Sequence, residues 1–533
     1  MSQQQVETPA ENPPAGADGA LDPTPRSPRE IRLVMIGLVV TMLLAMLDNL
    51  IVGTAMPTIV GDLGGAEHLS WVVTAYTLAT AASTPIWGKI GDLYGRKGTF
   101  LTSIVIFLVG SALAGLSQSM TQLIGFRALQ GLGAGGLMVG VMSIMGALVP
   151  PRDRGKYQGM FAAVMALATI GGPLVGGFIT DHLSWHWTFY INLPLGVIAL
   201  AVVVVTLKLP KVRSTAKIDY FGALLLTTGI TSLVLITTWG GQQYAWGSKT
   251  ILGLMALAAA SLIAFCYVEQ RVEEPMLPLG LFKNLNFTLV SIIGFIVGFA
   301  MFGAVTFLPL YQQTVQGASA TNSGLLLMPM MFGMLVVSLA VGQAVTKTGK
   351  YRIYPIIGTA VMAGGSLLLS TLGTDTTRFT SACYMIVLGA GMGFLMQITM
   401  LVAQNSAELK DMGVASSTAT LFRTIGGSFG VALFGAIFNN RVTSTMSALP
   451  KDPAQAGASH SEKLTQMGPA ELRKLPAQVQ DLYHHAVSNG IHTVFLWGAA
   501  ISLIAVAAAL FMKEIPLRGG PGQAKPEQHL EAV

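Results

Sequence analysis

The sequence predicts an all-α integral membrane protein with 14 transmembrane helices, built as two pseudo-symmetric six-helix bundles with an inserted helix pair between them. Composition is the first observation behind this prediction: 52% of the 533 residues are hydrophobic and 11% are charged, whereas a soluble domain carries about 25% charged residues. The second observation is a series of apolar segments, each long enough to span a bilayer. The third is an internal repeat. We expect the excess apolar surface to face lipid.

A membrane-spanning helix needs about 20 predominantly apolar residues. The segments that meet this requirement lie at 33–56, 70–90, 98–117, 121–147, 157–180, 187–207, 219–239, 249–270, 284–312, 320–345, 352–372, 379–404, 413–438 and 489–513. The predicted organisation is a disordered tail at 1–30, a first bundle at 31–207, an inserted segment with linkers at 208–283, a second bundle at 284–513 with an outer loop at 441–488, and a second disordered tail at 514–533.

The distribution of Lys and Arg predicts which side of the membrane the termini face. An even number of spans puts both termini on one side. With that side taken as the cytoplasm, the inner segments hold 22 of the 31 basic residues and the outer segments hold seven. Cytoplasmic loops are enriched in Lys and Arg, so we expect a multi-pass protein of the plasma or inner membrane with cytoplasmic termini. The net charge of +6 is attributed to topology and not to nucleic-acid binding.

Three short motifs recur in the same order in the two halves of the chain. GKIGDLYGR at 88–96 is echoed by GQAVTKTGK at 342–350, LGAG at 132–135 recurs at 388–391, and IGG at 170–172 recurs at 425–427. The offsets are 254, 256 and 255 residues, which indicates a duplicated six-helix unit with the segment 219–270 inserted between the copies. Two repeated bundles predict a central cavity near the bilayer midplane.

Asp48 is an acidic residue inside the apolar stretch LLAMLDNLIVG at 43–53. A carboxylate in hydrocarbon costs roughly 2.5–3.5 kcal/mol even on the mildest insertion scale. Of the 25 acidic residues, Asp48 is the only one that falls well inside a predicted span. It is therefore a candidate functional group. The alternative is a structural carboxylate that bonds a neighbouring helix through Asn49.

Arg127 is a second charge inside a predicted span, about two turns from its outer end. One interpretation is that Arg127 lines the cavity, tunes a nearby acid or relays protons. Gln130 lies one turn away on the same helix face and is positioned to hydrogen-bond it. The alternative is that Arg127 extends to the outer interface, which is the interpretation we favour for Arg423.

An enzyme, a metal centre and a cofactor site are not expected. An intramembrane hydrolase needs a paired constellation such as two Asp or His with Glu. His492, near the end of its segment, is the only histidine in a predicted span, and neither Cys266 nor Cys383 has a Cys or His neighbour at metal-ligand spacing.

Five motifs carry a resemblance to a known family. They are GKIGDLYGRK at 88–97, LDNLIVGTAMP at 47–57, GFRALQGLGAGG at 125–136, IGGPLVGG at 170–177 and WHWTFYINLPLG at 185–196. With these motifs the chain resembles, over about 31–515, the major facilitator superfamily and within it the fourteen-helix drug:proton antiporters. It departs from the pattern at Leu50, where the family has Thr, and at Thr346, where the first half has Asp92.

The resemblance implies roles for particular residues. Asp48 and Arg127 become the candidates for proton coupling. The loop between helices 2 and 3 implies a conformational latch made of Gly88, Asp92, Gly95 and Arg96. In that latch, Asp92 would pair with Arg96 or with a helix N-terminus of the other half.

The helix-5 motif implies antiporter helix packing through small residues. These residues are Gly172, Pro173, Gly176 and Gly177. Small residues at i and i+4 let helix backbones approach closely, and Pro173 adds a kink. We expect this helix to slide or rock against the helix at 320–345.

The resemblance implies a proton-coupled antiporter, driven by the proton motive force with no cofactor, that exports amphipathic drugs or antibiotics by alternating access. A single membrane acid predicts neutral or monocationic substrates. Candidate substrate-binding residues are Asn49, Gln130, Tyr311, Gln312, Met328 and Gln397. The expected partners are the small-molecule substrate, protons and the lipid bilayer, with no nucleic acid, and the protein is expected to be a monomer. The alternatives are an exporter of a physiological solute such as a secreted metabolite, peptide or lipid, and an uncoupled facilitator; Asp48→Asn separates the latter.

Overall fold

The structure, a computed structural model, describes residues 28–63, 69–149, 154–207, 218–240, 243–272, 274–318, 325–408, 411–447 and 477–517. The helices before the inserted pair are α1 (Pro28–Leu63), α2 (Leu69–Tyr94), α3 (Arg96–Gly115), α4 (Met120–Leu148), α5 (Arg154–His182), α6 (Trp187–Tyr190) and α7 (Asn192–Thr206). The inserted pair is α8 (Tyr220–Trp239) and α9 (Lys249–Glu269). The rest are η2 (Leu279–Lys283), α10 (Leu285–Thr314), α12 (Met328–Thr348), α13 (Ile353–Ser370), α14 (Arg378–Ser406), α15 (Met412–Ser447) and α18 (Ala477–Leu510).

The prediction of an all-α fold is confirmed. Within the described residues, 12 helical passes are long and apolar enough to cross a membrane, with α6 and α7 together forming one of them. The other two predicted spans fall on α2 and α5, helices of 26 and 29 residues. Both are rich in small and polar residues, and both pack between other helices. The count of fourteen spans therefore stays a prediction.

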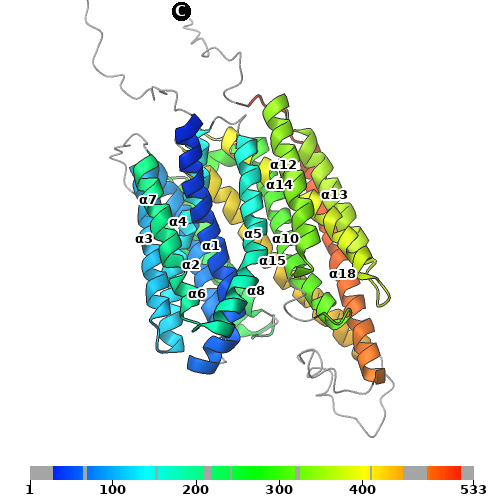
Figure 1. Ribbon diagram of the computed structural model, residues 1–533. Coiled ribbons are helices and arrows are strands. Elements are labelled where there is room, and N and C mark those ends of the chain that lie inside the picture. The colour runs from blue at the N-terminus through cyan, green and yellow to red at the C-terminus, as the bar shows by residue number, and fades with distance from the viewer. Residues whose placement is uncertain are drawn as a thin grey trace, which may run out of the picture.

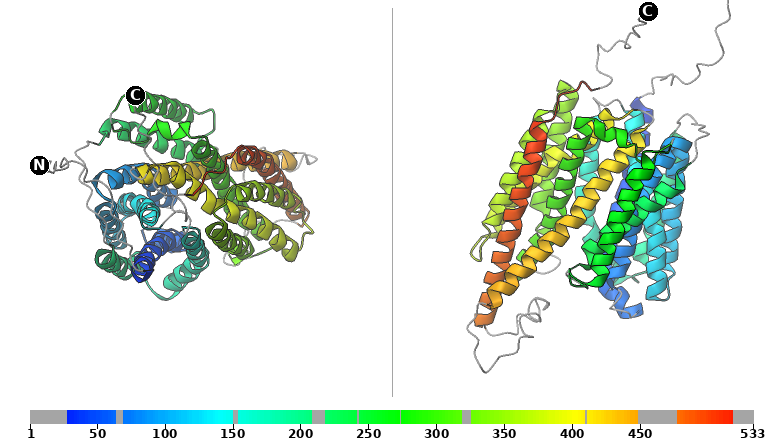
Figure 2. Two further views of the ribbon diagram at one scale, coloured as in Figure 1. Left: turned by 90° about the horizontal axis from the view of Figure 1, so that it is seen from above. Right: turned by 180° about the vertical axis from the view of Figure 1, so that it is seen from behind.

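Both described ends of the chain lie at the same end of the molecule, which we call the termini side (Figure 1). Helices α1 to α7 form a first group and helices α10 to α18 form a second group (Figure 2). The two groups lie closer together at the termini side and diverge toward the opposite side (Figure 1). The predicted tails and most of the predicted outer loop at 441–488 lie outside the described residues.

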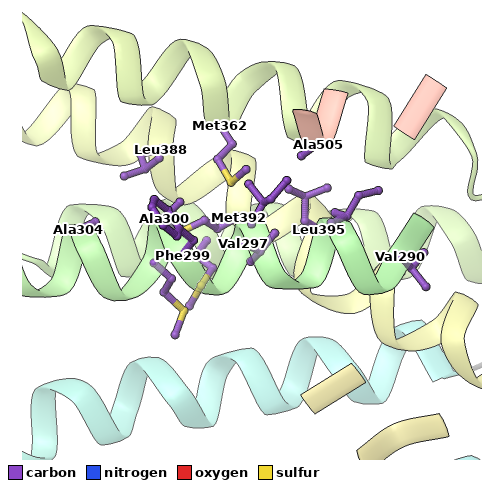
Figure 3. Packing of buried hydrophobic residues seen from close by; sticks show 14 of the residues in the cluster. Val290, Val297, Phe299, Ala300, Ala304, Met362, Leu388, Met392, Leu395 and Ala505 are labelled. Carbon is purple, nitrogen blue, oxygen red and sulfur yellow. The ribbon is translucent and has the colours of Figure 1, made fainter. Parts of the chain in front are cut away.

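In the second group, α10 packs against α14, α15 and α18, and α14 packs against α13. Figure 3 shows Val297, Met362, Leu388 and Met392 gathered in one layer between these helices. Lipid is as apolar as these side chains, so transfer from water does not drive helix association here. Close van der Waals contact does, which explains why small residues such as Gly391 lie directly against the backbone of Met362.

The inserted pair packs along one side of the molecule. Helices α8 and α9 pack against each other, and α8 also contacts α2 of the first group and α15 of the second. Figure 2 shows the pair, in green, lying beside the first group. Leu226 and Ile230 of α8 are buried in the same core cluster as α10. The inserted pair therefore bridges the two groups.

Candidate functional site

Asp48 is wholly buried in α1 and receives hydrogen bonds from three side chains. Arg127 Nη1 donates to its Oδ2 at 2.6 Å, which is also an ion pair. Gln130 Nε2 donates to Oδ1 at 2.8 Å and Asn192 Nδ2 donates to Oδ1 at 2.7 Å. Both carboxylate oxygens are thus satisfied inside an apolar helix bundle, with donors from α4 and α7.

Helix α4 brings Arg127 and Gln130 to one face because the two residues are three positions apart. Arg127 Nη1 also donates to Gln130 Oε1 at 2.7 Å. The close approach of α4 to α2 depends on Gly131, since a Cβ there would lie 3.0 Å from the Cβ of Ala79 and would overlap the Tyr76 carbonyl. The same approach places the Arg127 guanidinium 4.0 Å from the centre of the Tyr76 ring.

Asn192 is the first residue of α7, and a short polar chain holds its side chain in place. Its Nδ2 also donates to Ser111 Oγ at 2.9 Å, and Ser111 donates to the Phe189 carbonyl at 2.9 Å. Phe189 belongs to α6, so a carbonyl in the last turn before the break between α6 and α7 anchors this chain. Four helices, α1, α3, α4 and α7, therefore meet at one polar cluster.

The Arg127 guanidinium is incompletely satisfied. Within the described residues, its Nε and Nη2 have no hydrogen-bond acceptor. The Tyr76 ring lies over the guanidinium carbon, and a desolvated cation over an aromatic face gains about 2 kcal/mol or more. Removing one partner of a buried ion pair costs about 3–5 kcal/mol because it leaves the other charge uncompensated. Asp48 and Arg127 therefore depend on each other.

The geometry decides between the alternatives left open for Arg127. The side chain is 0% exposed, so extension to the interface is wrong for this residue, and the expected contact with Gln130 is present. Asn49 is exposed, so the amide that reaches Asp48 comes from Asn192 and not from the neighbouring residue. The sequence reasoning missed Asn192, Ser111 and Tyr76.

At the termini side, Asp92 makes both of the contacts expected of the latch. Arg96 Nε and Nη2 donate to its Oδ1 at 3.2 and 2.9 Å. The backbone N–H of Val414 donates to its Oδ2 at 2.9 Å. Val414 lies in the first turn of α15, so the carboxylate also faces the positive end of a helix from the second group.

Glycines allow this contact between the groups. A Cβ at Gly88 would lie 2.6 Å from Ser417 Oγ, and a Cβ at Gly413 would lie 2.6 Å from Asp92 Oδ2. Gly95 adopts φ 101°, a conformation that disfavours other residues, at the turn between α2 and α3. Any larger side chain at these positions would push α2 and α15 apart or strain the turn.

Asp92 lies beyond the span predicted at 70–90, in the last turn of α2. Its side chain is 5% exposed. Burial raises the pKa of the Asp92 carboxyl to about 6, and the guanidinium of Arg96 and the backbone N–H of Val414 oppose part of that rise.

Arg154 and Gln404 form a second contact between the groups, which the sequence reasoning missed. Arg154 is buried, and its Nη1 donates to Gln404 Oε1 at 3.0 Å. Gln404 Nε2 in turn donates to the Met142 carbonyl of α4 at 3.2 Å. Val414 with Asp92 and Arg154 Nη2 with the sulfur of Met412 are further hydrogen bonds between the two groups. All lie at the termini side, so this side is closed.

The helix-5 glycines pack against α1 and not against α12. A Cβ at Gly172 would lie 2.5 Å from the Leu50 Cβ, and a Cβ at Gly176 would lie 3.0 Å from the Ile51 carbonyl. A Cβ at Gly177 would meet no atom within 4 Å. The expected sliding of this helix on the helix at 320–345 stays a prediction, but Gly172 and Gly176 do not face that helix. Helix α5 does pack against α12, but through other residues.

Helix α5 runs through Pro173 without interruption, and the Pro173 side chain lies outside the described residues. Because α5 contacts both α1 and α12, it connects the helix that carries Asp48 to the second group.

The remaining candidate substrate residues are not gathered around Asp48. Tyr311 donates to the Gly373 carbonyl at 2.7 Å, Gln312 Nε2 donates to the Leu326 carbonyl at 3.4 Å, and Gln397 Nε2 donates to Ser338 Oγ at 2.8 Å. Met328 is 40% exposed. These four belong to the second group, and in the described residues their hydrogen-bonding partners do too.

Comparisons with known proteins identify the family. The family model of the Major Facilitator Superfamily matches residues 38–431. The chain is 38% identical to the multidrug transporter protein MdtP of Bacillus subtilis, covering 94% of this chain and 96% of that protein. It is 37% identical to multidrug resistance protein 3 of the same organism, covering 92% and 97%.

A further relative is an uncharacterised MFS-type transporter of Mycobacterium tuberculosis, 41% identical over 92% of this chain and 71% of that protein. Among solved structures, the proton:xylose symporter XylE matches 91% of this chain and 96% of its own with TM-score 0.60 and 13% identity. The human organic anion transporter MFSD10 matches 91% and 100% with TM-score 0.58 and 12% identity. The structural matches show the fold, and the family model with the relatives shows that this chain belongs to the major facilitator superfamily of multi-pass membrane transporters.

Proposed function

We propose that this transporter is a proton-coupled antiporter that exports amphipathic, neutral or monocationic drugs or antibiotics. One observation carries the proposal: the Asp48 carboxylate is wholly buried in an apolar bundle and neutralised by Arg127 at 2.6 Å. Two of the most similar relatives are named multidrug transporters, which supports the substrate class.

The ion pair gives the site two charge states. With Asp48 deprotonated, the carboxylate and the Arg127 guanidinium cancel and the site is neutral. A proton on Asp48 removes the negative charge and leaves the buried guanidinium unbalanced, so the site carries one positive charge. Like charges repel strongly where water is scarce. A monocationic substrate is therefore favoured while Asp48 is deprotonated and disfavoured once the proton has bound, which is the basis of exchange.

The arrangement of the groups corresponds to one state of an alternating-access cycle. Contacts at Asp92 and Arg154 close the termini side, and the groups diverge at the other side (Figure 1). With the termini side in the cytoplasm, as the distribution of basic residues predicts, this state faces outward. A proton arriving from outside would displace Arg127 from Asp48, and α5, packed on α1 through Gly172 and Gly176, would transmit the change to α12.

Transport into inverted membrane vesicles tests this proposal. With the vesicle interior acidic, the wild-type protein should concentrate a cationic dye, and adding the dye should dissipate part of the pH gradient. Asp48→Asn should abolish gradient-driven accumulation while the protein remains in the membrane. Asp375→Asn, a matched change at an exposed carboxylate, should behave as wild type.

Several outcomes would overturn the proposal. Accumulation by Asp48→Asn equal to that of wild type would remove the proton-coupling role of Asp48. Equilibration by wild type without accumulation would indicate an uncoupled facilitator. If a panel of dyes and antibiotics is not transported while a secreted metabolite, peptide or lipid is, the alternative substrate class is correct.

A further inference from the structure

A second pair of carboxylates lies at the termini side of the inserted helix pair. Asp219 precedes α8 and Glu269 is the last residue of α9. Asp219 Oδ1 accepts a hydrogen bond from the Gly222 N–H at 2.8 Å and so caps α8. Glu269 Oε1 accepts a hydrogen bond from the Leu277 N–H. Each carboxylate thus uses one oxygen for the backbone.

The other oxygen of each carboxylate is buried and has no hydrogen-bond partner in the described residues: these are Asp219 Oδ2 and Glu269 Oε2. Glu269 is only 4% exposed. A Cβ on Gly222 would lie 3.2 Å from Glu269 Oε2 and would overlap Asp219 Oδ2. The two unsatisfied oxygens therefore flank the same point, between α8 and α9. An unsatisfied buried oxygen is costly, and two negative charges side by side are more so.

The charged groups around this pair are too few to balance two carboxylates. From α2, Lys89 is 3% exposed, and its Nζ pairs with Glu274 at 2.9 Å. Arg271, just after α9, lies over the ring of Tyr267 at 3.7 Å. The charged groups that act on the Glu269 carboxyl are Asp219 and Lys89, and neither belongs to α15, the other helix packed on α8. Lys89, the ammonium that acts on Glu269, is thus already paired with Glu274.

We propose that Asp219 and Glu269 share one proton and form a second protonation site, separate from Asp48. A proton between the two free oxygens would remove one negative charge and satisfy both oxygens, as in other carboxyl pairs. A metal ion is a poorer occupant because hard cations require about six oxygen ligands, and no cluster of three metal-ligating side chains occurs among the described residues. This site does not depend on the proposed direction or coupling of transport.

The position of the site gives its proton a structural consequence. Lys89 comes from α2, and α8 packs on both α2 and α15. When the Asp219–Glu269 pair is protonated, Lys89 remains with Glu274 and ties the inserted pair to the first group. When the proton leaves, the pair becomes a competing partner for Lys89. The site therefore makes the hold of the inserted pair on α2 sensitive to the pH at the termini side.

Infrared spectroscopy of the full-length protein in membranes tests the site directly. We expect a C=O stretching band of a protonated carboxylic acid at neutral pH, lost in Glu269→Gln but retained in the exposed control Asp375→Asn. Asp219→Asn keeps the oxygen that caps α8 and should fold; it should shift the titration midpoint of the band to lower pH by about one unit or more, since strongly coupled carboxyls differ by at least that much.

Two results would overturn the proposal. One is a band that neither Glu269→Gln nor Asp219→Asn alters. The other is loss of the band at constant pH when Na⁺, K⁺ or Mg²⁺ is added, which would identify a cation as the occupant. Because the readout is a vibrational band and not transport, its failure is distinguishable from failure of proton-coupled export.

Discussion

Arg127 on α4 and Asp48 on α1 form a wholly buried ion pair, with Nη1 and Oδ2 2.6 Å apart. The pair lies entirely within the first group of helices. Its partners Gln130 and Asn192 come from the same group. Proton coupling is therefore expected to be a property of the first group, which must communicate with the second through helix packing.

The mutual dependence of Asp48 and Arg127 predicts strong non-additivity. Arg127→Gln should lower the free energy of unfolding by about 3–5 kcal/mol, because it leaves the Asp48 carboxylate buried without a counter-charge. Asp48→Asn should lower the free energy of unfolding by a similar amount, because it leaves the Arg127 guanidinium buried without a counter-charge. The double variant removes both charges and should be more stable than either single variant. Thermal unfolding in detergent measures this, and additive losses would show that the pair is not coupled.

Asn192 should contribute more to stability and transport than is usual for a neutral amide side chain. Asn192→Ala removes a donor from Asp48 and breaks the link to Ser111, so we expect a stability loss of about 1–3 kcal/mol and slower dye accumulation. The matched control for stability is Asn49→Ala, next to Asp48 in sequence but exposed, which should leave the free energy of unfolding unchanged. Equal effects of the two substitutions would mean that the hydrogen bond from Asn192 has no special weight.

The Gly88–Gly413 contact should be needed for closure of the termini side. Gly88→Ala would place a methyl group 2.6 Å from Ser417 Oγ and 2.9 Å from the Gly413 carbonyl, so it should disfavour the closed arrangement. In a background without Cys266 and Cys383, a cysteine at Ser417 should become more reactive toward an impermeant thiol reagent applied from the termini side. Gly98→Ala, in open space at the start of α3, is the control. Unchanged reactivity in Gly88→Ala would contradict the role of this contact.

Asp92 should make closure pH-dependent. Burial raises the pKa of its carboxyl to about 6 in the closed arrangement, whereas a solvated Asp titrates near about 3.9. The closed arrangement thus binds the proton more tightly, so acidification favours it. The extra stability of the closed arrangement appears as the pH falls through about 6 and is complete below about 4. The thiolate is the reactive form of a cysteine, so the reactivity of the Ser417 cysteine is compared at each pH with that of the same cysteine in Asp92→Asn. The ratio of the two rates should fall from pH 7 to pH 5; a rise of the ratio on acidification would refute the sign.

Charges in apolar segments were the part of the site that sequence could predict. Asp48 and Arg127 stand out because either is costly in a span unless it is paired. Asn192, Ser111 and Tyr76 do not stand out, since neutral polar and aromatic residues are common in membrane helices, and their convergence depends on how α1, α3, α4 and α7 pack. The assignment of Tyr311 and Gln397 as substrate contacts stays a prediction. Tyr311 Oη and Gln397 Nε2 donate within the second group, while the buried Gln397 Oε1 has no hydrogen-bond partner in the described residues.

Contacts between the groups were equally hard to predict. Arg154 and Gln404 are far apart in sequence and meet only because the two groups close at the termini side. Glu269 is a related case: as the last residue of α9 it looks like an interfacial charge, but the inserted pair buries it. Asp48 is therefore not the only buried acid, although it remains the one deep inside a span.

Gly172 and Gly176 should be the points at which α5 and α1 move together. A methyl group at Gly176 would overlap Thr54 Oγ1 and lie 3.0 Å from the Ile51 carbonyl. Since Ile51 and Thr54 follow Asp48 by one to two turns, a displaced α1 would disturb the ion pair as well. We expect Gly176→Ala to reduce gradient-driven dye accumulation several-fold and to lower the unfolding temperature. Gly177→Ala, where the added methyl meets no atom within 4 Å, should retain near wild-type transport. If both variants transport equally well, close packing of α5 on α1 is not required, and the link from Asp48 to the second group must follow another path.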